Sequence, residues 1–325
     1  MATTTVTALP RRRRLSKRRR RNLRNGLLFV APWIIGFLCF QLYPMLASLY
    51  YSFTTYSILD PGHWVGLDNY RVMFIQDPLF WTAVGNTLYY AFISVPLGLL
   101  VSLTLALLLN VRLREMAFYR TIYFLPSLVP AVAGSFLFLW LLNPEFGLIN
   151  SLLRYVGING PGWLTDPVWA KPSLILLSFW GIGLGTVIFL AGLGDIPQEL
   201  FEAATIDGAV WWRRLWAITV PMMTPTIFFN LIMGIIGSFQ VFTQVYIFGH
   251  GGSSDATTPP GSPQDSLLFY QLYLFVNAFR DLKMGYASAM AWVLMLAILA
   301  ITLAVFKTQR RWVFYMGTTL GEQEG

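Results

Sequence analysis

Six apolar runs constrain this sequence more than any other feature, because each is near or above the ~20 residues that a helix needs to cross the hydrocarbon core of a bilayer. They cover residues 26–51, 85–110, 118–142, 173–193, 225–248 and 286–306. Of the 325 residues, 56% are hydrophobic and only 12% are charged. The sequence therefore predicts an all-α, polytopic membrane protein with six transmembrane helices rather than a soluble globule.

A strongly basic arm precedes the first run. Ten of the 23 Lys and Arg residues lie between Arg11 and Arg24, so the rest of the chain holds 13 basic and 15 acidic residues. Because residues 1–25 are polar and show no apolar periodicity, we expect a disordered cytoplasmic arm. Contact with anionic membrane lipid explains this arm better than nucleic-acid binding. A cleaved signal peptide is disfavoured, since the first run exceeds a usual signal core and lacks a clear A-x-A site.

The remaining basic residues indicate the orientation. Residues 1–25, 111–117, 194–224 and the tail after 306, together with Arg120, hold 18 Lys and Arg, whereas the connections on the other side hold five. By the positive-inside rule, both termini and the tail at 307–325 are cytoplasmic, on either side of a transmembrane domain at 26–306. In the last outer connection, 249–285, the composition of GHGGSSDATTPPGSPQDS predicts a flexible loop.

The runs lack the groups that several membrane functions require. No Asp, Glu, Lys, Arg or His lies within the six cores except Arg120 at one edge, which argues against an ion-coupled carrier. Without an intramembrane Asp pair, an HExxH motif or a base for a serine, no catalytic site is expected. The G-x-x-x-x-G-K-[ST] loop is also absent, so another subunit would hydrolyse any ATP. The lone Cys39 and the two histidines predict no metal site, and no cofactor is expected.

The fifth run carries the most suggestive polar set. At helical spacing, one face would present Asn230, Gly234, Gly237, Gln240 and Gln244. Amides on such a face could hydrogen-bond a hydroxyl-rich solute, or could bond across helices as structural contacts. The breaks at Pro126, Pro130 and several glycines are equally open to two interpretations, close helix packing or a moving, pore-lining role.

A polar, charged segment at 195–225 separates the fourth and fifth runs, and we call it the docking loop. Asp195 is predicted to N-cap a short helix that ends near Ile206, with Gln198 three residues on. Gly208 can then adopt a positive φ before a second helical stretch at 209–217. Leu200, Ala203 and Ala204 would share a face that a partner can approach closely. A helix lying on lipid headgroups is the alternative, but such helices are usually basic and this one is acidic.

The docking loop strongly resembles the EAA loop of the inner-membrane permease subunits of binding-protein-dependent ABC importers. The resemblance rests on EAATIDGA at 202–209, followed by Ile218, Pro221 and Pro225; Leu215 departs from the aromatic residue expected there. Five further stretches resemble the carbohydrate-uptake branch, the maltose and glycerol-phosphate type permeases: GLDNYRVMF, NTLYY, YRTIYFLPSLVPAV, WLLNPEFGLINSLL and MGYASAMAW.

This resemblance implies a type I importer permease fold in a bacterial inner membrane. The subunit would pair with a second, similar permease, which in this branch differs in sequence, and would receive a sugar, polyol or sugar phosphate from an external solute-binding protein. Two cytoplasmic ATP-binding subunits would dock on Glu202, Ala203, Ala204, Asp207 and Gly208. Asn230, Gln240 and Gln244 are the candidate residues of the solute path. A stand-alone secondary carrier or channel is the alternative function.

Overall fold

The computed structural model describes residues 17–111, 114–249 and 259–314, and the chain divides into two units, 1–51 and 52–325. In the first unit, α1 (Lys17–Phe37) continues through a π-helical turn (Leu38–Leu42) into α2 (Tyr43–Tyr51). Because α1 begins at Lys17, residues 17–25 of the predicted disordered arm are helical, and that part of the prediction is wrong. The apolar run nucleates a helix that Lys and Arg, good helix formers, can extend.

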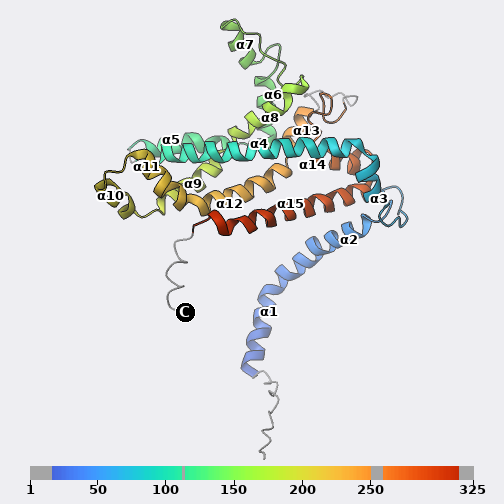
Figure 1. Cartoon of the computed structure of the whole chain (residues 1–325). Helices are drawn as coiled ribbons and strands as arrows, with labels where there is room; N and C mark the ends of the chain where they lie inside the picture. The colour runs from blue at the N-terminus through green and yellow to red at the C-terminus, as the bar shows by residue number, and fades with distance from the viewer. Residues whose placement is uncertain (1–16, 112–113, 250–258, 315–325) are drawn as a thin grey trace, which may run out of the picture. The chain divides into compact units, whose positions relative to one another are not determined.

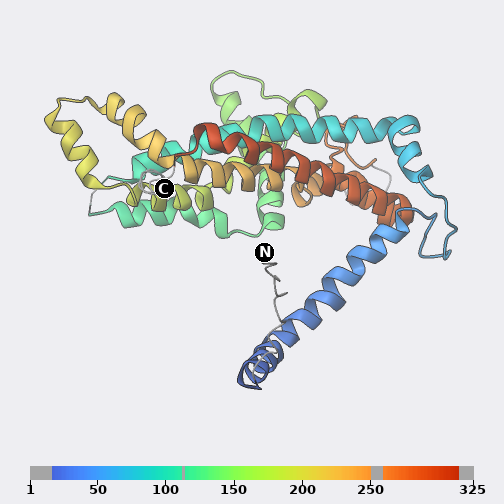
Figure 2. The ribbon, with the colours of Figure 1, turned by 60° about the horizontal axis from the view of Figure 1, so that its bottom comes forward.

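The second unit is built on three long helices, α4 (Pro78–Leu109), α12 (Val220–Phe239) and α15 (Met284–Trp312), which lie side by side (Figures 1 and 2). Asp77 starts α4, because its carboxylate accepts hydrogen bonds from the backbone N–H groups of Leu79 at 3.0 Å and Phe80 at 3.2 Å. Near the starts of α4 and α15, Phe80 packs with Met73, Tyr270 and Met290 in one buried cluster.

Two of the predicted spans are bent pairs of helices. The third run forms α5 (Met116–Phe124), a 3₁₀ turn (Leu125–Leu128) and α6 (Ala131–Leu141), with a bend of 95°. Pro130 explains this bend, because it lacks an N–H and keeps Val129 extended. The fourth run forms α8 (Pro167–Trp180) and α9 (Gly183–Gly194), bent by 49°. Among the described residues, four helices can span a membrane, or six if each bent pair is one span, which confirms the predicted class.

The fifth run is not one continuous helix. The helix α12 ends at Phe239, Gln240 takes φ −107° and ψ 14°, and a separate helix α13 covers Thr243–Gly249. The prediction of one polar face from Asn230 to Gln244 is therefore wrong, because the break at residues 240–242 interrupts the helical periodicity.

Short helices occupy the connections. Beyond the membrane-spanning segments lie α3 (Asp68–Arg71), α7 (Leu148–Tyr155) and α14 (Tyr270–Phe275), and the docking loop contains α10 (Gln198–Ile206) and α11 (Trp211–Arg214). The loop predicted to be flexible is only partly described. Within its described part, Gly261 and Ser266 are buried, so the prediction is wrong there, while residues 250–258 lie outside the described residues.

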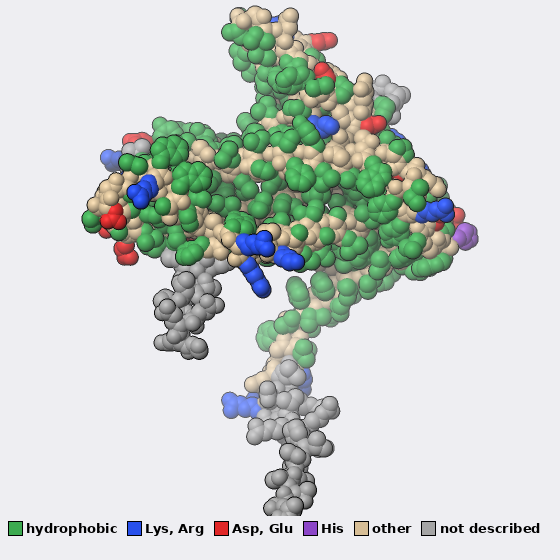
Figure 3. Space-filling model, in the orientation of Figure 1, with side chains coloured by type: hydrophobic (Ala, Val, Ile, Leu, Met, Phe, Trp, Pro, Cys, Tyr) green, Lys and Arg blue, Asp and Glu red, His purple; other side chains and the backbone are tan. Residues whose placement is uncertain are grey.

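The surface of the second unit matches a membrane environment. On the face that Figure 3 shows, hydrophobic side chains cover the long helices, and most charged side chains lie toward the helix ends. On α4, the side chains of Phe92 and Leu100 are 76% and 62% exposed. Such a surface would be costly in water and is favourable against lipid.

Candidate functional site

The first helix of the docking loop lies against the body of the second unit by one face only. Phe201 packs on a cluster that includes Phe189, Leu193 and Met223, and Ala204 is half-buried, whereas Glu202 and Ala203 are exposed. Asp195 does not start this helix: it closes α9, and Pro197 is the residue before α10. The predicted Asp195 cap is wrong because α9 continues to Gly194, which leaves Asp195 at its C-terminal end.

Gly208 turns the chain after α10, as predicted. Its φ is +73°, and its N–H donates to the Thr205 carbonyl at 3.1 Å, while the Ala209 N–H donates to the Ala204 carbonyl at 2.9 Å. These bonds satisfy the last carbonyl groups of α10 in the manner of a C-terminal glycine cap. The second helical stretch begins at Trp211 rather than at residue 209, since Val210 is extended.

One side-chain contact ties the two helices of the docking loop together. Arg214 at the end of α11 donates from Nη1 to Thr205 Oγ1 of α10 at 3.1 Å. The Arg214 Nε is buried and has no hydrogen-bond partner among the described residues. A cation near the C-terminal end of α10 also interacts favourably with the helix dipole. Sequence reasoning missed this role of Arg214.

A cavity of about 920 Å³, the α10 cavity, opens beside the docking loop. Glu202, Phe201 and Thr205 line one side, and Arg114 and Arg120 line the other. The Arg120 guanidinium donates to the Leu109 carbonyl at 3.0 Å, which fixes it at the end of α4. Of the five predicted docking residues, Glu202 alone is among those lining this cavity, and Ala203, Ala204, Asp207 and Gly208 are not.

A second cavity, of about 510 Å³, lies among α4, α8, α9 and α12, and we call it the central cavity. Its described lining is uncharged and combines apolar side chains and glycines with the polar side chains of Tyr90, Ser94, Ser102, Ser178, Asn230 and Ser238. The Asn230 Nδ2 donates to the Thr226 carbonyl at 3.0 Å, and a Cβ at Gly185 would lie 3.7 Å from Asn230 Oδ1. Hydroxyl and amide groups in this arrangement can exchange hydrogen bonds with a hydroxyl-rich solute.

Gln244 belongs to a different cavity, of about 240 Å³, that shares Tyr90, Ser178 and Leu184 with the central cavity. We call it the Gln244 cavity. Gln240 lies outside the residues that line either of them. The structure thus brings Asn230 together with Gly234 and Gly237 in the central cavity, places Gln244 in the adjoining cavity, and leaves Gln240 outside the lining of both. The serines of α4 and α8 were missed, because an isolated serine in an apolar run carries no distinguishing pattern.

A polar centre at the opposite end of α4 was also missed. Asp77 Oδ2 accepts hydrogen bonds from the hydroxyl groups of Tyr273 at 2.7 Å and Tyr286 at 2.5 Å. Burial raises the pKa of the Tyr273 hydroxyl above its ordinary value, and the neighbouring Asp77 carboxylate raises this pKa further. The dipeptide Asp77-Pro78 before an apolar run is a helix-start signal that could have identified Asp77.

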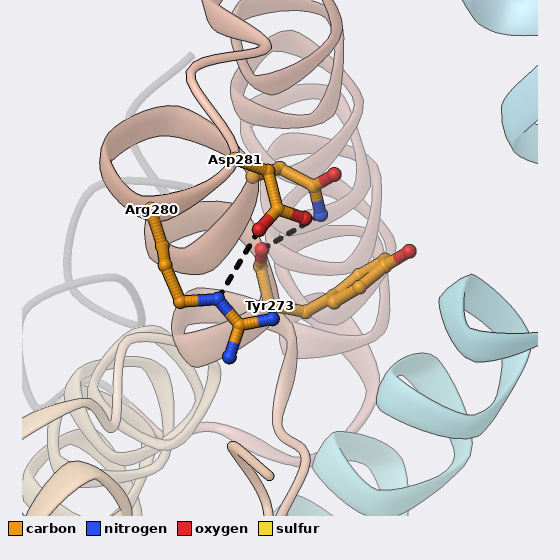
Figure 4. Close-up of polar contacts among 4 residues, drawn as sticks. Tyr273, Arg280 and Asp281 are labelled. Atoms are coloured by element: carbon orange, nitrogen blue, oxygen red, sulfur yellow. Dashed lines mark hydrogen bonds and ion pairs between the residues drawn. The ribbon is translucent and has the colours of Figure 1, made fainter. Parts of the chain in front are cut away.

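Next to Asp77 lies a further cavity of about 620 Å³, which Asn277 and Asp281 also line. Figure 4 shows the neighbourhood of Tyr273: Asp281 forms an ion pair with Arg280 at 3.1 Å, and Asn277 Nδ2 donates to the Tyr273 carbonyl at 2.9 Å. Among residues 17–111, 114–249 and 259–314, no group of three His, Cys, Asp or Glu could hold a metal ion. The contacts in Figure 4 are local to α14 and the turn after it, whereas the bonds from Tyr273 and Tyr286 to Asp77 connect α14 and α15 to the start of α4.

Comparison with known proteins shows which family has this sequence and architecture. Residues 94–313 match the family described as binding-protein-dependent transport system inner membrane component. The chain is 44% identical over 292 residues to the probable ABC transporter permease protein YesP of Bacillus subtilis (strain 168), covering 89% of this chain and 92% of YesP. It is 36% identical over 296 residues to the lactose transport system permease protein LacF of Rhizobium radiobacter, covering 88% of this chain and 94% of LacF.

Solved structures agree with these matches. In the crystal structure of a bacterial ABC transporter involved in the import of the acidic polysaccharide alginate, one chain superposes with a TM-score of 0.78 and 26% identity, covering 91% of this chain and 99% of that one. A chain of the alginate transporter in complex with an alginate pentasaccharide-bound periplasmic protein superposes with a TM-score of 0.77.

Proposed function

This chain belongs to the inner membrane components of binding-protein-dependent transport systems, among the sugar ABC importer permeases, and on that premise we propose that it forms the path for a neutral sugar or polyol. The observation that carries the proposal is the central cavity, whose described lining is hydroxyl-bearing, amide-bearing and apolar, and uncharged. A sugar phosphate or an acidic sugar, such as the alginate imported by the structural neighbour, would need a cation from a partner subunit or a helix N-terminus.

We propose further that the docking loop couples this path to ATP. The exposed side chains of Glu202 and Ala203 and the turn at Asp207 and Gly208 would contact an ATP-binding subunit, with Ala204 giving room for close approach. Two such subunits would hydrolyse ATP, and their closure would move α10 and switch the cavity between inward-facing and outward-facing states. Support comes from the one-sided packing of α10, which leaves its acidic face free for a partner.

The remaining parts of the assembly follow from the same proposal. A second permease, different in sequence, would complete the solute path, and an extracytoplasmic binding protein would deliver the solute. The distribution of Lys and Arg supports cytoplasmic termini in a bacterial inner membrane, with residues 1–25 and 307–325 on the side of the ATP-binding subunits.

Reconstitution into liposomes tests the function directly. The assembly of this chain with a second permease, two ATP-binding subunits and a binding protein should import a neutral sugar only when ATP is present. Liposomes that contain this chain alone are the control. Uptake by this chain without the other subunits would contradict the proposal and establish a stand-alone carrier or channel.

A further inference from the structure

Residues 261–269 fold back into the second unit at the end of α4 that is remote from α10, and we call this segment the outer plug. Its last four residues are buried, with Leu267 and Phe269 at 0% and 1% exposure. The Leu267 N–H donates to the Gly261 carbonyl at 3.0 Å, which closes the segment on itself. Gly261 has φ +89°, and a Cβ there would lie 2.6 Å from Leu268 Cβ, so the turn requires glycine.

A single buried amide on α4 holds the outer plug. Asn86 Nδ2 donates to the Asp265 carbonyl at 2.7 Å and to the Leu268 carbonyl at 3.0 Å, and Asn86 Oδ1 accepts from Lys171 Nζ at 3.0 Å. The next residue, Thr87, accepts from the Tyr270 N–H at 2.9 Å through its hydroxyl oxygen. Both Nδ2 hydrogens of Asn86 therefore bond to the plug, and α4 fixes two backbone carbonyls within the segment and the N–H of the residue that follows it.

The outer plug contacts the residue of α4 at which the lining of the central cavity begins. Along α4, the residues that line this cavity begin at Tyr90 and continue to Ser102, toward the docking loop. Asn86 lies four residues before Tyr90, about one helical turn or 6 Å further out. The ring of Phe269 packs edge-on against Tyr90, with ring centroids 5.6 Å apart. A solute that enters the cavity past Tyr90 would therefore meet the ring of Phe269.

We propose that the outer plug is the gate of the solute path at the extracytoplasmic end, and that Asn86 is its latch. This inference rests on the proposed function, which requires this end to open when solute is delivered. The Asn86 amide is neutral, and water can replace each hydrogen bond between it and the plug when the plug leaves. Opening therefore does not require an ion pair between the plug and α4 to be broken. Removing the latch shifts the equilibrium toward the open state.

A single-cysteine reporter tests the latch. Cys39 is the only cysteine, so a Cys39→Ser background leaves one thiol when Ser266→Cys is added. Ser266 is 7% exposed, and its Oγ has no hydrogen-bond partner among the described residues, which makes the substitution mild. In the complete transporter in membranes, a membrane-impermeant maleimide applied from outside should react slowly. Asn86→Ala should raise the labelling rate about tenfold, since the lost bonds no longer hold the plug.

The chain offers a matched control in Asn150. This asparagine is also buried, donates from Nδ2 to the carbonyls of Pro144 and Pro161 at 3.2 Å each, and accepts from Trp163 Nε1 at 2.7 Å. It holds a different outer connection, so Asn150→Ala should leave the labelling rate at residue 266 unchanged. Equal rates in the Asn86→Ala and Asn150→Ala variants would overturn the latch.

If the Asn86→Ala variant assembles poorly, a second variant and a second measurement still test the proposal. Asn86→Asp keeps the side-chain shape and the Lys171 contact but removes both donors, and it should also accelerate labelling. With Asn86 intact, a non-hydrolysable ATP analogue should accelerate labelling of Ser266→Cys in the complete transporter; an unchanged rate would exclude the plug as a gate. The nucleotide-free Asn86 comparison needs no transport, so it can succeed or fail independently of the proposed function.

Discussion

The docking loop and the central cavity are built in opposite ways. The docking loop takes its candidate residues from seven consecutive positions, 202–208, and holds them with local backbone bonds and one side-chain contact from Arg214 to Thr205. The central cavity draws its polar side chains from three helices that are distant in sequence, α4, α8 and α12. Substitutions in the docking loop should therefore disturb coupling to ATP and spare solute affinity, while substitutions in the cavity should do the reverse.

The largest effect should come from Gly208→Pro. Proline fixes φ near −65° and lacks the N–H that Gly208 donates to Thr205, so the turn after α10 cannot form at φ +73°. We expect solute-stimulated ATP hydrolysis by the complete transporter to fall about 100-fold, while the chain still inserts in membranes.

Gly157→Pro is the matched control for that variant. Gly157 has φ +77°, donates its N–H to the Arg154 carbonyl at 3.0 Å and follows α7, on a connection remote from the docking loop. The complete transporter with Gly157→Pro should hydrolyse ATP at a rate close to that of the transporter without the substitution. Equal losses in the two glycine variants would show that any damaged helix end, and not the docking loop in particular, stops coupling.

Glu202→Lys should have the next largest effect. The side chain is exposed and lines the α10 cavity, so a lysine reverses the charge presented to the partner and adds a third cation to a cavity that Arg114 and Arg120 also line. Uptake should fall about tenfold at unchanged solute affinity. Glu199→Lys is the control, because it makes the same charge change at another exposed position of the same helix. An unchanged rate for Glu202→Lys would remove this residue from the docking surface.

Smaller effects are expected in the cavities. Asn230→Ala and Gln244→Ala should each raise the solute concentration for half-maximal uptake about two- to tenfold, the loss of one hydrogen bond to the solute. ATP hydrolysis without solute should not change. Gln240→Ala is the internal control, because Gln240 lines neither cavity among the described residues. If Gln240→Ala matched the other two variants, the division of the fifth run at residues 240–242 would be functionally irrelevant.

The smallest effect should come from Arg214→Ala. The Arg214–Thr205 contact is exposed, and such contacts stabilise weakly, so we expect a two- to threefold decrease in the uptake rate, about 0.5 kcal/mol. Arg213→Ala, one residue earlier and exposed, should leave uptake unchanged. A loss as large as that of Gly208→Pro would mean that this side chain, rather than the glycine turn, holds α10 in place.

Much of this architecture was predictable because it depends on local patterns. The length of the apolar runs predicts the spans. The position of Gly208 after EAATID predicts both the end of α10 and the positive φ of Gly208. The predictions were wrong where a neighbouring element or a distant contact overrode the local sequence pattern. Asp195 is a good N-cap residue type, but α9 extends far enough to place it at a C-terminal end instead. The Pro- and Gly-rich composition of 259–266 favours a flexible loop, yet bonds from Asn86 order it.

By itself, the sequence determined the class of protein, the approximate spans and the place of the docking loop, because hydrophobic length and charge act through nearby residues and add along the chain. Only the tertiary structure decided which polar groups meet. Asn86 and Leu268 are 182 positions apart, and Asp77 and Tyr286 are 209 apart. A hydrogen bond depends on distance and direction within a fraction of an ångström, and the packing of α4, α14 and α15, rather than any spacing in the chain, sets both.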